Sequence, residues 1–375
     1  MNAGHDLSLV HHLAELPDPR LDRTKKHHLG DILIIALCAT IAGADSWEEV
    51  QRFGEAKLAW LKGFLSLPHG IPSHDTFNRV FARIDPVAFG RCVADWIDGV
   101  CRETGLRHVA IDGKSARSAP RPTSTGCLHL VNAWAAENRM ILGQRAVADG
   151  SNEIAAIPEL LRVLDLKGAL VTYDAAGCQA AIAGQIRRQG GHYLLAVKGN
   201  QPTLQAAVHA VFERACESDF AGLVHDGHEQ VEDGHGRHEE RYTTVIYDPV
   251  GLPEGWPDVA AVVLVGRERR ANGSNASTSH YYLTSHRGTA AELGRLVRRH
   301  WSVENELHWV LDMAFGEDSN RTAAGHAGAN LGLIRRIAAS LLQQDPGKGS
   351  IKAKRLNAAL DEGYLMRALR GFTAI

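Results

Sequence analysis

The fold is decided where Arg107-His-Val-Ala-Ile-Asp112, a short apolar run ending at an acid, follows a long segment of helical pattern. Leu128-His-Leu-Val-Asn-Ala-Trp134 and Met140-Ile-Leu-Gly-Gln-Arg-Ala146 are similar runs, and the Glu-Asn-Arg between them is typical of a turn. A helix is expected from near Asn152. This part of the chain therefore predicts three consecutive strands followed by a helix.

Two further strands extend the pattern. Gly168-Ala-Leu-Val-Thr-Tyr-Asp174 is again an apolar run ending at an acid, residues 177–189 have a helical period, and His192-Tyr-Leu-Leu-Ala-Val-Lys198 predicts a fifth strand. Strands alternating with helices predict an α/β fold, with a mixed sheet and flanking helices. The order of three strands, helix, strand, helix and strand is that of the ribonuclease H-like fold, although order alone leaves other α/β folds open.

The residues before this sheet predict an all-helical N-terminal domain over 1–105. Gly70-Ile-Pro72 breaks the helical pattern, Ser73 is a candidate N-cap, and Asp85-Pro86 ends the helix that follows. Its predicted apolar face holds Phe77, Val80, Phe81 and Ile84, and its polar face holds His74, Asp75, Asn78 and Arg79. This helix is either the recognition helix of a helix-turn-helix or an ordinary amphipathic core helix.

A β-rich insertion is predicted over residues 201–284, with strand-like pieces at 241–247, 259–265 and 280–284. The helical period returns over 289–315 and 331–342. The predicted α/β domain thus comprises 106–200 and 285–345, and a basic C-terminal tail covers 346–375.

Composition excludes several classes of protein. With 45% hydrophobic and 22% charged residues, the chain is neither fibrous nor disordered. The longest apolar run, residues 32–42, is shorter than the roughly 18 to 20 residues of a membrane span. The 6 cysteines form no CxxC pair, and the start has no signal-peptide pattern. We therefore expect a cytoplasmic protein with reduced thiols and no membrane partner.

Charge is informative only locally, because 41 basic against 43 acidic residues give a net charge of -2. Residues 286–300 carry four arginines against Glu292, and residues 348–370 carry six Lys or Arg against two acids, whereas residues 226–240 are acidic. Each basic stretch is either a solvated helix face or a contact to nucleic acid.

Three carboxylates are candidates for chemistry. Asp112 and Asp174 end apolar runs, where an α/β sheet presents groups to a crevice, and Glu304 lies in an apolar helical segment. If they converge, their oxygens suit Mg²⁺, with Mn²⁺ as a substitute, and two such ions favour phosphodiester cleavage. Taken singly, these signals are weak, because an acid at the end of a strand is often only a turn former or a helix cap. Four further acids are either surface groups or substitute ligands: Glu306, Asp312, Glu317 and Asp318.

Ten segments, in order along nearly the whole chain, carry a family resemblance. They are Asp18-Pro-Arg20 with Lys25-Lys-His27, and the segments at 71–77, 110–115, 128–134, 151–154, 174–179, 198–202, 234–237, 300–305 and 349–352. Together they resemble the H-repeat-associated transposases of bacterial insertion sequences, a branch of the DDE (Asp-Asp-Glu) transposases.

The resemblance implies that Asp112, Asp174 and Glu304 form a metal-binding triad on a ribonuclease H-like core. It also implies Mg²⁺ as cofactor and double-stranded DNA as partner, both as terminal inverted repeats and as target. Because two DNA ends must be cut, it further implies a homodimer or larger synaptic complex. The expected location is the bacterial nucleoid. One departure is that Val297, His300 and Leu311 stand where the broader group has Tyr, Arg and Lys.

Several further residues are expected near the crevice. Lys114, and Lys198 with Asn200, are predicted to contact phosphate, the alternative being that the lysines are exposed loop cations. Arg298 and Arg299 are predicted to supply the missing charge. Arg79 is expected to bind DNA from the N-terminal helices. His300 and His308 are predicted to flank Glu304 on one helix face and to orient it, or else to be buried histidines packed on Trp301 and Trp309.

The sequence therefore predicts a DNA transposase that binds terminal inverted repeats and carries out Mg-dependent hydrolysis and strand transfer. An inactive or domesticated relative, acting as a sequence-specific DNA-binding protein, is the alternative. A carbohydrate hydrolase with paired carboxylates is disfavoured by the basic segments and by an aromatic content of only 6%.

Overall fold

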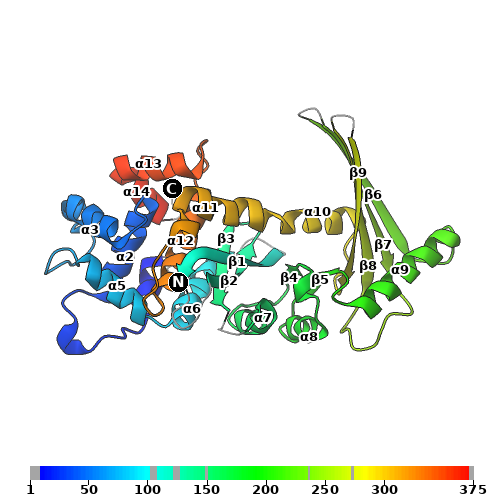
Figure 1. Ribbon diagram of the computed structural model, residues 1–375, viewed down its shortest axis with the longest axis horizontal. Coiled ribbons are helices and arrows are strands. Elements are labelled where there is room, and N and C mark those ends of the chain that lie inside the picture. The colour runs from blue at the N-terminus through cyan, green and yellow to red at the C-terminus, as the bar shows by residue number, and fades with distance from the viewer. Residues whose placement is uncertain are drawn as a thin grey trace, which may run out of the picture. The chain divides into compact units, whose positions relative to one another are not determined.

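The computed structural model describes residues 9–101, 108–120, 127–147, 151–234, 237–271 and 274–370. The chain divides into two compact units, shown together in Figure 1. Unit 1 comprises residues 1–105, 113–164 and 303–375, and unit 2 comprises residues 106–112 and 165–302. Strand β1 (His108–Pro120) passes from unit 2 to unit 1 between Asp112 and Gly113.

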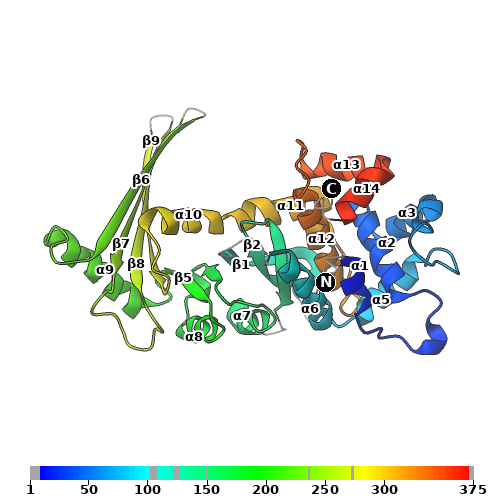
Figure 2. The same cartoon turned by 180° about the vertical axis from the view of Figure 1, so that it is seen from behind.

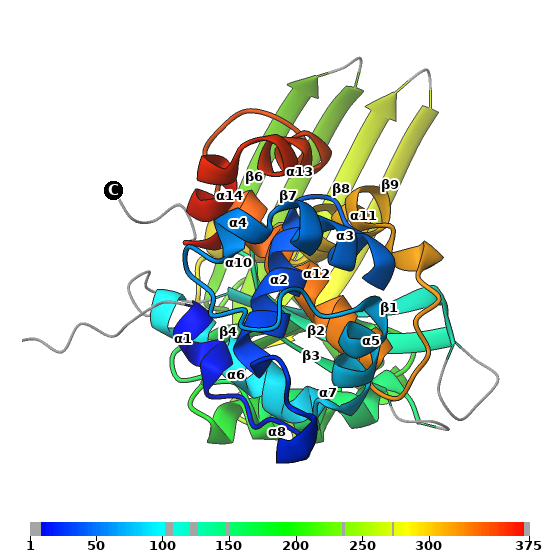
Figure 3. The same ribbon diagram turned by 90° about the vertical axis from the view of Figure 1, so that its left-hand side faces the viewer.

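Unit 1 is mostly helical. Its helices are α1 (Leu9–Ala14), α2 (Leu29–Ile41), α3 (Trp47–Ala56), α4 (Leu58–Leu61), α5 (His74–Arg83), α6 (Pro86–Cys101), α7 (Glu153–Leu161), α11 (Trp309–Phe315), α12 (Ala327–Gln343), α13 (Ile351–Leu360) and α14 (Glu362–Leu369). The apolar helices α2 and α12 are buried along almost their whole lengths and lie side by side, as Figure 3 shows. No helix among the described residues is both long and apolar enough to span a lipid bilayer.

Helix α5 confirms the local prediction made for it. The Ser73 hydroxyl accepts the Thr76 N–H at 3.4 Å, which caps the first turn. The predicted apolar face is buried, whereas His74, Asp75 and Arg79 are exposed. The buried face packs on α3 and on α12 from the other end of the chain.

Two basic segments are partly internal. The guanidinium of Arg20 donates to Asp18 and to the His27 carbonyl, each at 2.8 Å. The segment predicted as a basic tail forms α13 and α14, and its Arg355 is buried, donating to the Thr40 carbonyl at 3.1 Å. These cations stabilise unit 1 by capping internal carbonyls, so they are not part of a solvated basic face.

Unit 1 also contains the start of the sheet, in the order β3-β2-β1. Strands β2 (Cys127–Ala135) and β3 (Met140–Ala146) are antiparallel and paired from Leu130↔Ala146 to Ala135↔Met140. The predicted turn between them is present, with Arg139 at φ 53°. Helix α12 packs against both strands, and α6 and α7 pack against β3.

Unit 2 continues the sheet in the order β1-β4-β5-β9-β8-β7-β6. Strand β4 (Leu170–Tyr173) is parallel to β1 and to β5 (His192–Val197), whereas β9 (Ser274–Thr284) is antiparallel to β5. Strands β8 (Ala261–Ala271), β7 (Arg237–Tyr247) and β6 (His225–Gly234) complete an antiparallel group. The mixed α/β sheet and the three strands predicted between 241 and 284 are confirmed.

Two elements of unit 2 escaped prediction. Strand β6 reads His-Asp-Gly-His-Glu-Gln-Val-Glu-Asp-Gly and has no apolar alternation, because it is an exposed edge strand paired only with β7. Helix α9 (Pro202–Glu217) starts with Pro202 at its first position. Helix α8 (Ala180–Arg188) was expected and contacts β5.

Helices cover both faces of the antiparallel strands in unit 2, as Figures 1 and 2 show from opposite sides. Consecutive tyrosines of β9 point to opposite faces, since the side-chain period of a strand is two. Tyr281 contacts Phe212 of α9, with ring centroids 5.6 Å apart. Tyr282 lies with Val297 and His300 of α10 (Ala290–His300), which also packs on β6 and β7.

The helix predicted over 289–315 is interrupted, and the prediction of one continuous helix is wrong. Helix α10 ends at His300, residues Val303–His308 form a π-helical segment (η3), and α11 follows. The wider turn leaves the apolar spacing near-helical, so periodicity alone does not reveal it. The boundary between the two units also falls here, between Ser302 and Val303.

Candidate active site

Asp112 and Asp174 lie at the same level of two neighbouring strands. Strands β1 and β4 are parallel and pair in register up to Ile111↔Tyr173. Asp112 is the next residue of β1, which continues to Pro120 and does not end at the predicted acid, whereas Asp174 directly follows the last residue of β4. Parallel neighbours lie about 4.8 Å apart, and side chains at paired positions point to the same face. Both aspartates are half-buried. Unit 2 therefore holds the two aspartates at the same level of adjacent strands.

The turn after β4 fixes Asp174. Its Oδ1 accepts the Ala176 N–H at 2.9 Å and caps the short 3₁₀ helix η2 (Ala175–Gly177). A side chain at Gly177 would place its Cβ 1.3 Å from Cδ1 of Tyr173, so only glycine fits over that ring. Asn200 donates to the Ala175 carbonyl at 2.6 Å. The Asn200 side chain, predicted to contact phosphate, thus bonds the loop after β5 to the turn that holds Asp174.

A pocket opens beside Asp174 in unit 2. Its walls are mainly apolar, and its ionisable or polar lining residues are Thr172, Tyr173, Asp174, Lys198, His280, Tyr282, His300 and Trp301. A carboxylate and an ammonium group therefore line one pocket. Lys198 is exposed, which a lysine needs to be in order to contact a DNA phosphate.

Thr172 joins two buried histidines behind this pocket. Its hydroxyl lies 2.9 Å from Nδ1 of His300 and 2.8 Å from Nε2 of His108. Burial lowers the pKa of His300 to about 4 and that of His108 to about 3, so both rings are neutral near pH 7. The single Thr172 proton is donated to one ring, and the oxygen accepts from the other.

The two predicted flanking histidines lie in different surroundings. His300 is buried in unit 2, and its ring edge contacts Trp301, with centroids 5.6 Å apart. His308 belongs to unit 1, where its Nε2 lies 3.4 Å from Nδ2 of Asn132. Burial lowers the pKa of His308 to about 3. Trp309, which follows His308 in the chain, is 62% exposed.

Glu304 is an exposed residue of the π-helical segment in unit 1. The neighbouring Val303 and Leu307 take the inward positions of this segment. Its convergence with the two aspartates stays a prediction. Among the described residues, no group of three or more His, Cys, Asp or Glu side chains could hold a metal ion.

Lys114 is buried in unit 1 and pairs with two half-buried aspartates. Its Nζ lies 2.7 Å from Oδ1 of Asp312 on α11 and 3.7 Å from Oδ1 of Asp318. Burial raises the pKa of Asp312, and the Lys114 ammonium opposes that shift. The side chain predicted to contact phosphate is thus held between two carboxylates.

The predicted arginine contacts differ in environment. Arg298 donates to the two carboxylate oxygens of Glu232 on β6, at 2.5 and 3.2 Å. These bonds, with one from Arg241, lower the pKa of Glu232 to about 2. Arg299 is half-buried, and Arg79 is exposed on α5 with its Nε donating to the Asp75 carbonyl.

Sequence reasoning missed a buried polar network in unit 1. Arg336 of α12 is fully buried and donates to Asn132 at 2.7 Å and to Glu317 at 2.5 Å. A single asparagine within the apolar run 128–134 was the available signal, because a buried amide needs a partner.

Comparison with known proteins identifies the class. Residues 103–341 match the family described as "Transposase DDE domain", and residues 10–97 match the one described as "DDE_Tnp_1-associated". The chain therefore belongs to the DDE transposase family, as its sequence motifs predicted.

Two relatives span almost the whole chain. "Putative transposase YncI" of Escherichia coli O157:H7 is 38% identical over 370 residues, covering 96% of this chain and 94% of that protein. "H repeat-associated putative transposase YhhI" of Escherichia coli K12 is 36% identical over 372 residues, covering 97% and 98%. A solved piggyBac transposase synaptic complex with hairpin DNA aligns with 98% of this chain and 79% of its own, at a TM-score of 0.39 and 10% identity.

Proposed function

We propose that this protein is the DNA transposase of a bacterial insertion sequence, cutting and joining DNA at terminal inverted repeats in the bacterial cytoplasm, at the nucleoid. The proposal rests on Asp112 and Asp174, which directly follow the in-register pair Ile111↔Tyr173 of two neighbouring parallel strands. The sheet orders β3-β2-β1 in unit 1 and β1-β4-β5 in unit 2 support a ribonuclease H-like core. Two ends must be cut, so the active form is a homodimer or larger synaptic complex on DNA.

Asp112, Asp174 and Glu304 would hold the metal, and their oxygen donors suit Mg²⁺ or Mn²⁺. When bound, the metal activates water and stabilises the leaving oxygen of a phosphodiester.

The remaining residues have binding roles in this proposal. Lys198, exposed at the rim of the pocket beside Asp174, contacts a DNA phosphate. Arg79, exposed on α5, and the N-terminal helices bind the inverted repeats. Arg298 and Arg299 add positive charge on α10, where Glu232 positions Arg298.

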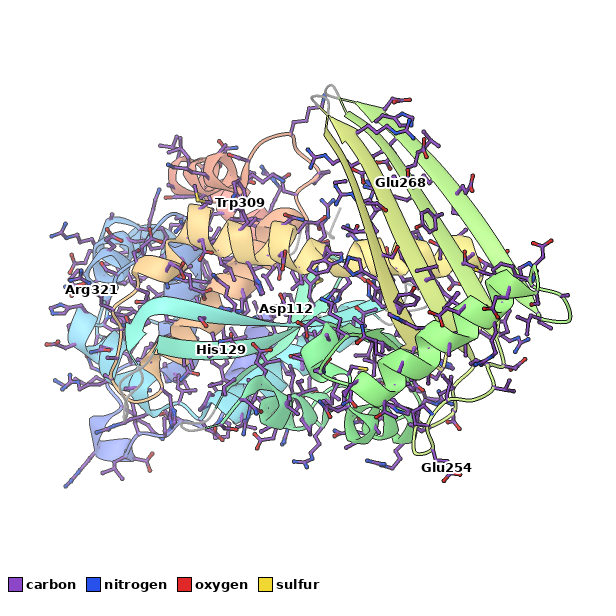
Figure 4. All side chains as sticks on the ribbon, turned by 45° about the vertical axis from the view of Figure 1, so that its right-hand side comes forward. Asp112, His129, Glu254, Glu268, Trp309 and Arg321 are labelled. Atoms are coloured by element: carbon purple, nitrogen blue, oxygen red, sulfur yellow. The ribbon has the colours of Figure 1, made fainter. Side chains whose placement is uncertain are left out.

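The test uses the full chain and duplexes carrying the inverted repeats that bracket its gene. With Mg²⁺ the protein should cut the repeat end, and with EDTA it should bind without cutting. Asp112→Ala, Asp174→Ala and Glu304→Ala should each abolish cleavage and keep repeat binding. Glu254→Ala is the control, because this exposed acid of unit 2 lies on a loop away from Asp112 in Figure 4.

Each outcome decides between the candidate functions. Specific binding by the wild type with no metal-dependent cleavage would establish the alternative, a DNA-binding relative without activity. Cleavage that survives Glu304→Ala would remove Glu304 from the triad and leave the two aspartates as the metal ligands.

A further inference from the structure

Three side chains form a hydrogen-bonded chain in unit 1. The first of them belongs to Ser115, three residues after Asp112 on β1. The Ser115 hydroxyl of β1 lies 2.7 Å from Nδ1 of His129 on β2. The other ring nitrogen, Nε2, lies 2.6 Å from Oε1 of Glu153, the first residue of α7. All three side chains are half-buried, and Figure 4 labels His129 on its strand. We call this set the Ser115–His129–Glu153 cluster.

The hydrogen bonds have a defined direction. An ionised Glu153 can only accept, so Nε2 of His129 carries a proton and donates it. In the neutral ring Nδ1 is then the acceptor, and the Ser115 hydroxyl donates to it. The carboxylate of α7 therefore sets the tautomer of His129, and His129 sets the orientation of Ser115.

The cluster also packs on the backbone of Gly113. A Cβ at Gly113 would lie 2.2 Å from Oε1 of Glu153 and 2.8 Å from Nε2 of His129. Gly113 and Ser115 share one side of β1, while Lys114 points to the other side and bonds to Asp312. The three residues that directly follow Asp112 are thus fixed from both sides of the strand.

We propose that His129 and Glu153 are positioning residues for Asp112, acting through the backbone of residues 113–115 to which Asp112 is bonded. This inference rests on the proposed function, in which Asp112 is a metal ligand. The rival explanation is a purely structural cluster that ties β1, β2 and α7 together. Outer partners that orient a metal ligand typically contribute 10- to 100-fold to metal affinity, whereas a structural cluster contributes only to folding stability.

Unit 2 offers a matched control. Nε2 of His286 lies 3.1 Å from Oε1 of Glu292, with side-chain exposures of 21% and 31%. The His129–Glu153 pair has exposures of 20% and 29%. His286→Ala therefore removes a His–Glu bond of the same kind and burial outside the cluster.

The experiment measures Mn²⁺ binding to the full chain by electron paramagnetic resonance, together with thermal unfolding. His129→Ala should weaken Mn²⁺ binding about 10-fold, and Glu153→Gln, which keeps the side-chain shape, should weaken it several-fold. His286→Ala should bind Mn²⁺ as the wild type does, with a similar loss of melting temperature. Asp112→Ala defines the signal that belongs to the site.

Wild-type affinity in both His129→Ala and Glu153→Gln, with lowered melting temperatures, would overturn the positioning role and leave the proposed function intact. If the wild type shows no Mn²⁺ binding that depends on Asp112, both proposals fall. Should His129→Ala not fold, the near-isosteric Glu153→Gln decides alone, because its affinity is either reduced or unchanged.

Discussion

Nζ of Lys114 lies 2.7 Å from a carboxylate oxygen of Asp312, a residue 198 positions further along the chain. Removing the ammonium leaves Asp312 with an uncompensated charge, so Lys114→Met should destabilise the fold by about 1–3 kcal/mol. Urea denaturation measures this. Lys198→Met is the matched control, since Lys198 is exposed: it should keep stability and weaken DNA binding. The opposite pattern, with Lys114→Met stable but poor in DNA binding, would assign Lys114 to phosphate contact.

The buried histidines make stability depend on pH. The pKa of His300, about 4, lies below the ordinary value of 6.5, so the unfolded chain binds more protons between these two values. Stability should therefore be full above pH 6.5 and fall as the pH drops from 6.5 towards 4, by up to about 1.4 kcal/mol per pH unit for this group. Urea unfolding between pH 4.5 and 7.5 measures this dependence: the free energy of unfolding should change less with pH in His300→Asn than in the wild type. Equal slopes would contradict the buried neutral ring.

Gly177 supports the turn that carries Asp174. Gly177→Ala should destabilise the protein by about 1–3 kcal/mol, because the new Cβ would overlap the Tyr173 ring and force the turn to move. Repeat cleavage should fall more than repeat binding. Gly227→Ala is the control, since nothing lies within 4 Å of its Cβ position. Unchanged cleavage in Gly177→Ala would show that Asp174 tolerates a shift of its turn.

Gly113 and Glu153 should be energetically coupled. A Cβ at Gly113 displaces the Glu153 carboxylate, so Gly113→Ala and Glu153→Ala remove the same interaction. We expect each single variant to weaken Mn²⁺ binding. The double variant should bind Mn²⁺ with the same affinity as Gly113→Ala alone. Additive losses in the Mn²⁺ titration would mean that the two residues act independently.

Local patterns predicted the order of the elements and several of their ends, although β1 continues past Asp112 to Pro120. The sequence revealed the apolar runs that end at Asp112 and Asp174, the cap at Ser73 and the turn before Met140. These features could be predicted because strand alternation, capping and turn chemistry each depend on a few neighbouring residues. Family motifs added the class of protein, which the comparisons confirmed.

The tertiary structure alone decided which charged residues are internal and which helix is interrupted. Nothing in the sequence distinguishes three buried cations, Lys114, Arg336 and Arg355, from ordinary surface cations. In the structure, carboxylates or carbonyls from distant segments bind them in the interior. The π-helical turn at Glu304 and the polar edge strand β6 likewise depend on packing and pairing that no local period records. The physical reason is that burial of a charge is determined by partners brought together by folding, whereas periodicity describes only the residues next to it in the chain.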